Sequence, residues 1–236
     1  VMFQYTEEDS RPILALRHLK IKAGEKIAIL GRNGAGKSTL LQLLAGMQSP
    51  SNGSVHLDGL DISLIDPADV RRDMALLNQN AHLFYGTIRE NLTLGAPLAK
   101  DDDILKALKV TGALGFVQEK KEGLDHLVLE GGVGFSGGQK QALLLARLLI
   151  RQPNILLLDE PTAAIDDIAE KQLIDHLKGW LGHRTLVVAT HRRAVLELVD
   201  RIIVMNEGKV VMDGPRDQVL NQSAGQQKQI KQGEDS

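Results

Sequence analysis

One glycine-rich segment carries residue types that suit phosphate binding. Gly31-Arg32-Asn33-Gly34-Ala35-Gly36-Lys37-Ser38, the phosphate loop, matches G-x-x-x-x-G-K-[ST] at every fixed position. The apolar run from Lys26 to Leu30 predicts a strand before it, and the leucine spacing predicts a helix from Lys37 to Ala45 after it. Backbone N–H groups and the positive helix end would together bind anions, so we predict a nucleotide-phosphate site rather than an ordinary glycine-rich turn. Lys37 can reach the outer phosphates, Ser38 can bind Mg²⁺, and Thr39 can bond an inner phosphate.

Two adjacent carboxylates follow a second apolar run. Ile155 to Leu158 predicts a buried strand, and Asp159-Glu160 comes directly after it. Two acids at the end of a buried strand are costly unless they meet a cation. We therefore expect Asp159 to hold Mg²⁺ and Glu160 to polarise a water toward the γ-phosphate. A surface turn is the alternative, because Asp-Glu-Pro also favours turns, and the phosphate loop argues against it.

A third segment combines a serine with two glycines at a predicted helix start. Phe135-Ser136-Gly137-Gly138-Gln139 precedes a helical pattern that runs from Gly137 to Ile150. Ser136 is a good N-cap, and such a helix start can bind an anion. Taken alone, the segment is best interpreted as a capped helix.

Together these three segments resemble the nucleotide-binding domain of an ABC ATPase, and the resemblance covers roughly residues 1–220. It implies that Tyr5 stacks on adenine and that Gln79 touches Mg²⁺ and the attacking water. It also implies that Ser136, Gly137, Gly138 and Gln139, the signature segment, cover the γ-phosphate of ATP held by a second subunit. Asp166 would lie in the loop that links the two sites, and His191 would contact the γ-phosphate. Tyr5 as an ordinary strand aromatic, Gln79 as a solvated loop residue and His191 as a capping or surface histidine remain alternatives.

Three positions depart from the family pattern. Phe135 stands where leucine is usual, Lys140 where arginine is frequent, and Ala163 where serine is common. None is a phosphate-contacting position, so we expect activity to be retained.

Strand and helix patterns alternate along most of the chain, which predicts an α/β fold with a parallel sheet. The resemblance implies a P-loop NTPase with a RecA-like parallel core, an antiparallel β subdomain and an inserted α-helical subdomain. We expect the core and β subdomain in residues 1–85 and 153–220, the helical subdomain in 86–152, and a disordered tail in 221–236. Residues 1–5 alternate loosely and are expected to be β-rich, and short strands are expected within 53–80, with a turn at Asp58-Gly59. The other predicted strands are 13–21, 26–30, 74–77, 155–158, 185–189 and 201–205, and the predicted helices are 37–45, 67–72, 101–110, 114–120, 137–150, 168–181 and 194–198.

Several stretches are similar to exporters rather than importers. They are Leu129 to Gly134 before the signature segment, Leu83 to Leu92, Asp66 to Arg72, and Leu94 to Pro97. The last two look most like bacterial type I secretion ATPases that export RTX toxins and adhesins. A plain glycine-rich linker remains an alternative for the loop 127–134. This resemblance implies a head-to-tail homodimer with two ATP molecules, a transmembrane domain in the same parent chain, a periplasmic adaptor and an outer-membrane channel. It places the domain at the cytoplasmic face of the bacterial inner membrane, and the start at Val1 leads us to expect a longer parent chain.

Composition limits the other classes of function. The 236 residues hold 28 Lys plus Arg against 30 Asp plus Glu, a formal net charge of −2, which argues against nucleic-acid binding through bulk charge. The chain has no cysteine, so disulfides and thiolate metal sites are excluded. An ATPase of a lipid or drug exporter, a soluble non-transport ABC ATPase, and a cassette that binds ATP without turning it over remain alternatives. Soluble relatives usually carry two cassettes or long insertions, and Glu160 with His191 argues against a cassette without turnover.

Overall fold

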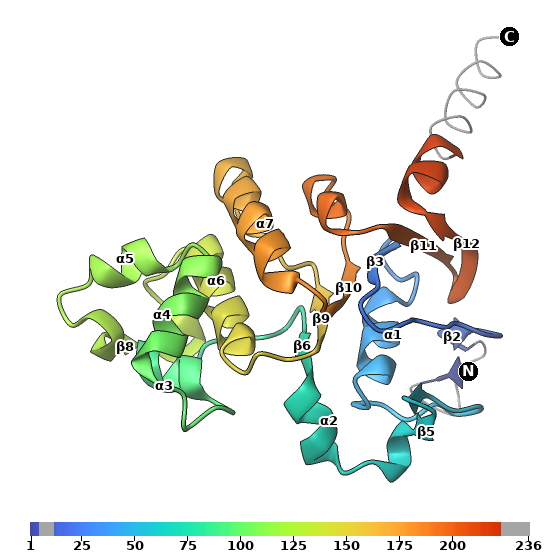
Figure 1. The fold of residues 1–236 in the computed structure, drawn as a ribbon, viewed down its shortest axis with the longest axis horizontal. Coiled ribbons are helices and arrows are strands. Elements are labelled where there is room, and N and C mark those ends of the chain that lie inside the picture. Colours follow the sequence, from blue (N-terminus) through green and yellow to red (C-terminus); the bar gives the residue numbers. More distant parts are fainter. Residues whose placement is uncertain (5–11, 223–236) are drawn as a thin grey trace, which may run out of the picture.

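A six-stranded sheet forms the centre of the computed structural model, which describes residues 1–4 and 12–222. Its strand order is β12-β11-β3-β10-β9-β6 (Figure 1). The five parallel strands are β6 (Met74–Leu77), β9 (Ile155–Asp159), β3 (Lys26–Leu30), β10 (Thr185–Ala189) and β11 (Arg201–Asn206). The edge strand β12 (Lys209–Pro215) is antiparallel to β11 and was not expected from the sequence. The predicted α/β class with a parallel core is thereby confirmed.

Both faces of this sheet are covered, which explains why its inner strands are almost continuously apolar. Ile27 and Ile29 point to one face and pack in a cluster with residues of α1 (Lys37–Leu44). Ala28 points to the other face, with residues of α6 (Gly137–Leu149) and α7 (Asp167–Leu181). Side chains alternate along a strand, so a five-residue strand serves two cores at once.

The helical segment expected between residues 86 and 152 is present and lies to one side of the sheet (Figure 1). Its helices are α3 (Ile88–Thr93), α4 (Asp101–Val110), α5 (Leu114–Gln118) and α6. A short antiparallel pair, β7 (Gly86–Thr87) with β8 (Leu127–Val128), joins the start of this region to the segment before α6 and was not predicted. The division of the chain into a core and a helical subdomain stays a prediction.

Short antiparallel pairs lie on the other side. β1 (Met2–Phe3) pairs with β2 (Leu14–Ala15), and β4 (His56–Leu57) pairs with β5 (Leu60–Asp61). Helix α2 (Pro67–Asp73) begins at the proline that predicted it. The predicted strand over 13–21 is wrong beyond Ala15. In the pair of β2 with β1, Ala15 lies opposite Met2, and the last bond of the pair runs from the Leu16 N–H to the Val1 carbonyl.

Two further predictions need adjustment. Residues 194–198 form a 3₁₀ helix, Ala194–Leu198, in place of the expected α-helix. Residues 216–222 are helical, so the first two residues of the expected tail belong to a helix, and residues 223–236 lie outside the described part. In the described residues no helix is both long and apolar enough to cross a bilayer.

Candidate active site

A cleft of about 730 Å³ opens where the parallel strands β6, β9 and β10 end. In open α/β sheets the carboxyl ends of the strands share one edge, so residues distant in sequence meet there. Every residue predicted for catalysis or metal binding lines this cleft: Lys37, Ser38, Gln79, Asp159, Glu160 and His191. From the predicted phosphate-binding set, Asn33, Gly34, Gly36 and Thr39 line it as well.

The phosphate loop packs closely on its surroundings at two of its glycines, Gly31 and Gly36, where no side chain would fit. A Cβ on Gly31 would lie 2.5 Å from the Met205 carbonyl oxygen. Gly36 has φ +94°, and a Cβ there would lie 2.6 Å from a methyl carbon of Leu14. Gly31 and Ala35 therefore shape the loop from behind without lining the cleft. Lys37 is only 8% exposed, and its Nζ donates to the carbonyls of Gly31 at 3.0 Å and Arg32 at 3.3 Å.

Asp159 is a buried carboxylate at the last position of β9, 4% exposed. Burial raises its pKa, the charge of Glu160 raises it further, and a hydrogen bond from Ser38 together with the charge of Lys37 opposes the rise. The carboxylate of Asp159, the hydroxyl of Ser38 and the amide of Gln79 supply hard oxygen atoms on one cleft wall. Mg²⁺ prefers such a sparse oxygen set, which leaves positions for water and phosphate. The residues present fit a magnesium ion.

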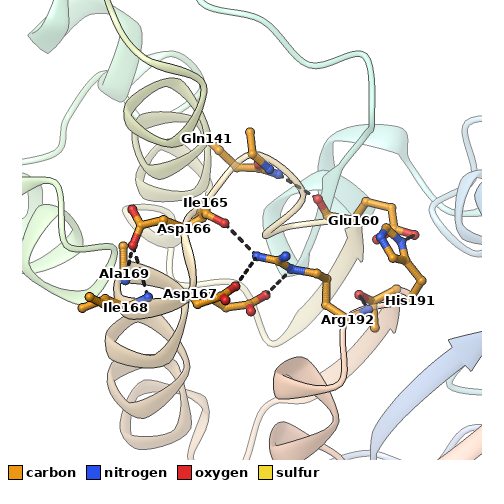
Figure 2. A network of polar contacts seen from close by, with 12 residues as sticks. Gln141, Glu160, Ile165, Asp166, Asp167, Ile168, Ala169, His191 and Arg192 are labelled. Atoms are coloured by element: carbon orange, nitrogen blue, oxygen red, sulfur yellow. Dashed lines mark hydrogen bonds and ion pairs between the residues drawn. The ribbon is translucent and has the colours of Figure 1, made fainter.

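Glu160 sits at the turn after β9 with a left-handed backbone, φ +48°. Its N–H donates to the Ala189 carbonyl at 2.9 Å, and its Oε1 lies 2.9 Å from Nδ1 of His191. Its Oε2 is buried and has no hydrogen-bond partner among the described residues. A buried carboxylate oxygen without a donor is costly, so this atom is a ready acceptor for a small donor such as water. Figure 2 shows the Glu160 and His191 side chains beside each other.

His191 follows β10 and its side chain is 70% exposed. With one ring nitrogen directed at Glu160, the other is available to a group in the cleft. Gln79 is exposed on the cleft wall after β6.

The signature segment begins α6 through a capping box. Ser136 Oγ accepts from the Gln139 N–H at 3.2 Å, and Gln139 Oε1 accepts from the Ser136 N–H at 3.0 Å. Gly137 lines the cleft of its own chain, whereas Ser136, Gly138 and Gln139 are not among its lining residues.

Asp166, also predicted for binding, is not brought to the cleft. Asp166 caps α7, where its Oδ1 accepts from the N–H groups of Ile168 and Ala169 at 3.1 and 3.0 Å (Figure 2). Its carboxylate is therefore committed to the helix start, and it does not line the cleft. Tyr5 lies outside the described residues.

Sequence reasoning missed several residues around this site. Lys140 and Gln141, from the first turns of α6, line the cleft, and so do Ile13 and Asn78. Gln141 follows Gly137 by four residues, so both lie on one face of the helix. That spacing is the feature of the sequence from which Gln141 could have been predicted to line the cleft. Arg192, next to His191, was also missed, and it bonds to the Ile165 carbonyl and the Glu170 carboxylate.

Comparison with known proteins gives a consistent picture. Residues 16–163 match the family model described as ABC transporter. The chain is 39% identical over 225 residues to the leukotoxin translocation ATP-binding protein LktB of Mannheimia glucosida, covering 95% of this chain and 32% of that protein. It is 37% identical over 223 residues to a putative export ATP-binding/permease protein of Rickettsia conorii, covering 94% of this chain and 39% of that protein.

A solved structure shares the fold. A bacterial Atm1-family ABC exporter with ATP bound superposes with a TM-score of 0.87 at 32% identity, over 94% of this chain and 39% of that one. The chain thus spans about a third of the length of the curated relatives it matches.

Proposed function

Because this chain belongs to the ABC transporter family, we propose that it binds Mg²⁺-ATP in the cleft at the strand ends and hydrolyses it to drive export. The family makes it an ATPase domain. The roles of individual residues, the partners and the exported substrate belong to the proposal.

One observation carries the assignment of hydrolysis. Glu160 places an unpartnered, buried carboxylate oxygen in the same cleft as the Lys37 ammonium and the phosphate-loop N–H groups. Water held by Glu160 attacks the γ-phosphorus and gives a proton to the Glu160 carboxylate, the bond from that phosphorus to the β–γ bridging oxygen breaks, and ADP and phosphate leave. Lys37 and the backbone donors stabilise the negative charge that spreads in the transition state. His191 fixes the Glu160 carboxylate through Oε1 and offers its other nitrogen to the γ-phosphate.

A magnesium ion, when bound, would neutralise phosphate charge. Ser38 and Asp159 would hold it, with Gln79 at its edge. The buried position of Asp159 is consistent with this role. Burial makes the negative charge of its carboxylate unfavourable, and a bound cation would compensate that charge.

A second copy of the chain would complete each site. Ser136 and Gly137 are exposed at the start of a 13-residue helix, where N–H groups favour an anion. Three of the four signature residues do not line the cleft of their own chain, which supports a head-to-tail dimer in which they meet the partner's nucleotide. Asp166 would lie between the two sites in such a dimer. Its carboxylate caps the start of α7, so it would link the sites by holding the backbone of its loop in place. Tyr5 would supply the adenine contact.

The export role rests on the relatives and on an exposed apolar surface. Phe84, Tyr85, Leu129 and Val133 are 41%, 67%, 45% and 62% exposed near the β7–β8 pair. Such a patch suits a segment of a membrane-spanning partner. We propose type I protein secretion at the cytoplasmic face of the bacterial inner membrane, with an adaptor and an outer-membrane channel. An exporter of another class, such as one for lipids or drugs, is the second candidate, because an exporter described only as Atm1-family shares the fold.

Phosphate release from Mg²⁺-ATP tests the hydrolytic part. We expect steady turnover that stops when EDTA removes Mg²⁺, and ATP binding without turnover would reduce the chain to a binding module. The parent gene tests the export part. Several apolar spans of about 20 residues encoded before Val1 are expected, and their absence would favour a soluble ATPase.

A further inference from the structure

Gln141 bonds to the loop that carries Glu160, which we define as residues 160–166, the Glu160 loop. Its Nε2 donates to the Glu160 carbonyl at 2.8 Å, and its Oε1 accepts from the Ala164 N–H at 3.1 Å. One side chain therefore bonds to both the first and the fifth residue of the loop. Figure 2 shows Gln141 reaching the loop from α6, above it in this view.

The start of α6 packs on the same loop without spare room. A Cβ added to Gly137 would lie 3.0 Å from the Ala164 Cβ, and one added to Gly138 would lie 3.2 Å from the Ala164 carbonyl oxygen. Both distances are shorter than an ordinary van der Waals contact, so even a methyl group fits between the helix start and the loop only if one of them shifts. Because the two are packed this closely, a movement of the helix start displaces the loop as well. Gln141 adds directional bonds to this steric contact.

Arg192 holds the far end of the loop. Its Nη2 donates to the Ile165 carbonyl at 2.7 Å, and its Nε donates to Glu170 Oε1 at 2.9 Å (Figure 2). The loop is thus fixed on one side by the signature helix and on the other by the residue that follows His191.

Glu160 needs such support because its backbone is strained. A left-handed conformation costs a residue with a side chain about 1 kcal/mol or more. Its N–H is held by Ala189 and its side chain by His191. The remaining group, the carbonyl, accepts from the Ala163 N–H at 3.3 Å within the loop and from Gln141 Nε2 at 2.8 Å, so Gln141 supplies its shorter bond and its one link to α6.

We propose that Gln141 is a positioning residue that sets the orientation of the Glu160 carboxylate and links it to the signature segment at the start of the same helix. This inference rests on the proposed function, because it concerns the residue that we place beside the attacking water. Closure of the signature segment on a partner's nucleotide would then adjust the chain's own Glu160 through α6 and Gln141.

Gln141→Met tests the proposal, since methionine keeps the length and removes both bonds. We expect the 236-residue chain to lose about ten- to a hundredfold in kcat for ATP, the range that small misplacements cause, with KM and the Kd for ATP unchanged within about twofold. Gln141→Glu keeps the acceptor for Ala164 and loses the donor to the Glu160 carbonyl, so its kcat should also fall. Gln172→Met, on the exposed surface of α7, is the matched control and should turn over normally.

Thermal unfolding and a Glu160→Gln variant separate the outcomes. Equal melting temperatures for Gln141→Met and the wild-type chain, with reduced kcat, support positioning. Full turnover in Gln141→Met or Gln141→Glu beside an inactive Glu160→Gln overturns this inference and leaves the proposed function intact. Near wild-type turnover in Glu160→Gln itself removes Glu160 from the role of polarising water, and this inference with it, while hydrolysis of ATP by the chain stands. The double variant should be no slower than Glu160→Gln alone, because residues that act as a unit are not additive.

Discussion

Nδ1 of His191 lies 2.9 Å from Oε1 of Glu160, across a sequence separation of 31 residues. The pairing of two neighbouring strands explains the contact. In the parallel ladder of β9 and β10, Asp159 is opposite Ala189, so the residues that follow each strand emerge side by side. The histidine that we propose to contact the nucleotide and the carboxylate that we propose to polarise water are thereby placed by the sheet itself, and loops do not have to bring them together.

Replacing Glu160 by glutamine should remove the acceptor for water while keeping the size of the side chain. We expect turnover to fall by about 10²–10⁴-fold, as for the loss of a general base, with ATP binding preserved. Phosphate release and nucleotide titration measure the two quantities separately. Asp175→Asn, an equivalent acid-to-amide change on the exposed face of α7, should leave both unchanged. Turnover near the wild-type rate would exclude Glu160 as the residue that polarises water.

Replacing Asp159 by asparagine should remove a charge that burial makes unfavourable. Burial raises the pKa of Asp159 above 3.8, so the folded chain holds this proton more tightly than the unfolded chain. The ionised group therefore lowers the free energy of unfolding at neutral pH, and the penalty fades as the pH falls through the raised pKa toward 3.8. Without Mg²⁺ at pH 7, Asp159→Asn should melt at the same temperature as the wild-type chain or higher, with a difference that shrinks toward about pH 4.

With Mg²⁺-ATP, the wild-type chain should instead melt at a higher temperature than Asp159→Asn. The wild-type chain gains stability from bound ligand by mass action, whereas Asp159→Asn should gain less at the same Mg²⁺ concentration. Melting curves with and without Mg²⁺-ATP make the comparison. A variant that melts lower without Mg²⁺ and gains as much with it would show that Asp159 is a structural acceptor for Ser38 and no metal ligand.

Arg192→Met should destabilise the fold strongly, because it leaves the Glu170 carboxylate buried and unpaired. The Glu170 side chain is 6% exposed and Arg192 Nε donates to it at 2.9 Å. Removing one partner of a buried pair costs about 3–5 kcal/mol, so the free energy of unfolding in urea should fall by that amount. Adding Glu170→Gln should recover part of the loss.

The exposed neighbour Arg193 provides the control for this pair. Arg193→Met should change the free energy of unfolding by less than about 0.5 kcal/mol. If Arg192→Met were equally harmless, the pair would not hold the Glu160 loop.

Local signals made a large part of the site predictable. A loop between strand and helix, and two acids at the end of an apolar strand, are encoded in neighbouring residues, so the phosphate loop, Asp159 and Glu160 were placed in one cleft correctly. Gln141 and Arg192 were missed because their roles depend on which loop packs against them, and single-residue chemistry does not reveal that. Asp166 shows the converse: the implied linking role named the residue, but its carboxylate caps α7.

The same distinction holds for the fold. Five parallel strands were predicted from apolar runs, whereas β12 alternates exposed and half-buried residues, carries no buried run, and was recognised only once paired with β11. The strand predicted over 13–21 ends early because only Leu14–Ala15 finds a partner strand, and alternation alone cannot show whether one exists.

Sedimentation of Glu160→Gln with saturating Mg²⁺-ATP tests the central claim most directly, namely that two chains enclose the nucleotide before water attacks. The account predicts a species of about twice 25.7 kDa that reverts to 25.7 kDa with ADP, and that is absent when Ser136→Arg is added. A single 25.7 kDa species while ATP is bound, or a dimer that ignores Ser136→Arg, would contradict it.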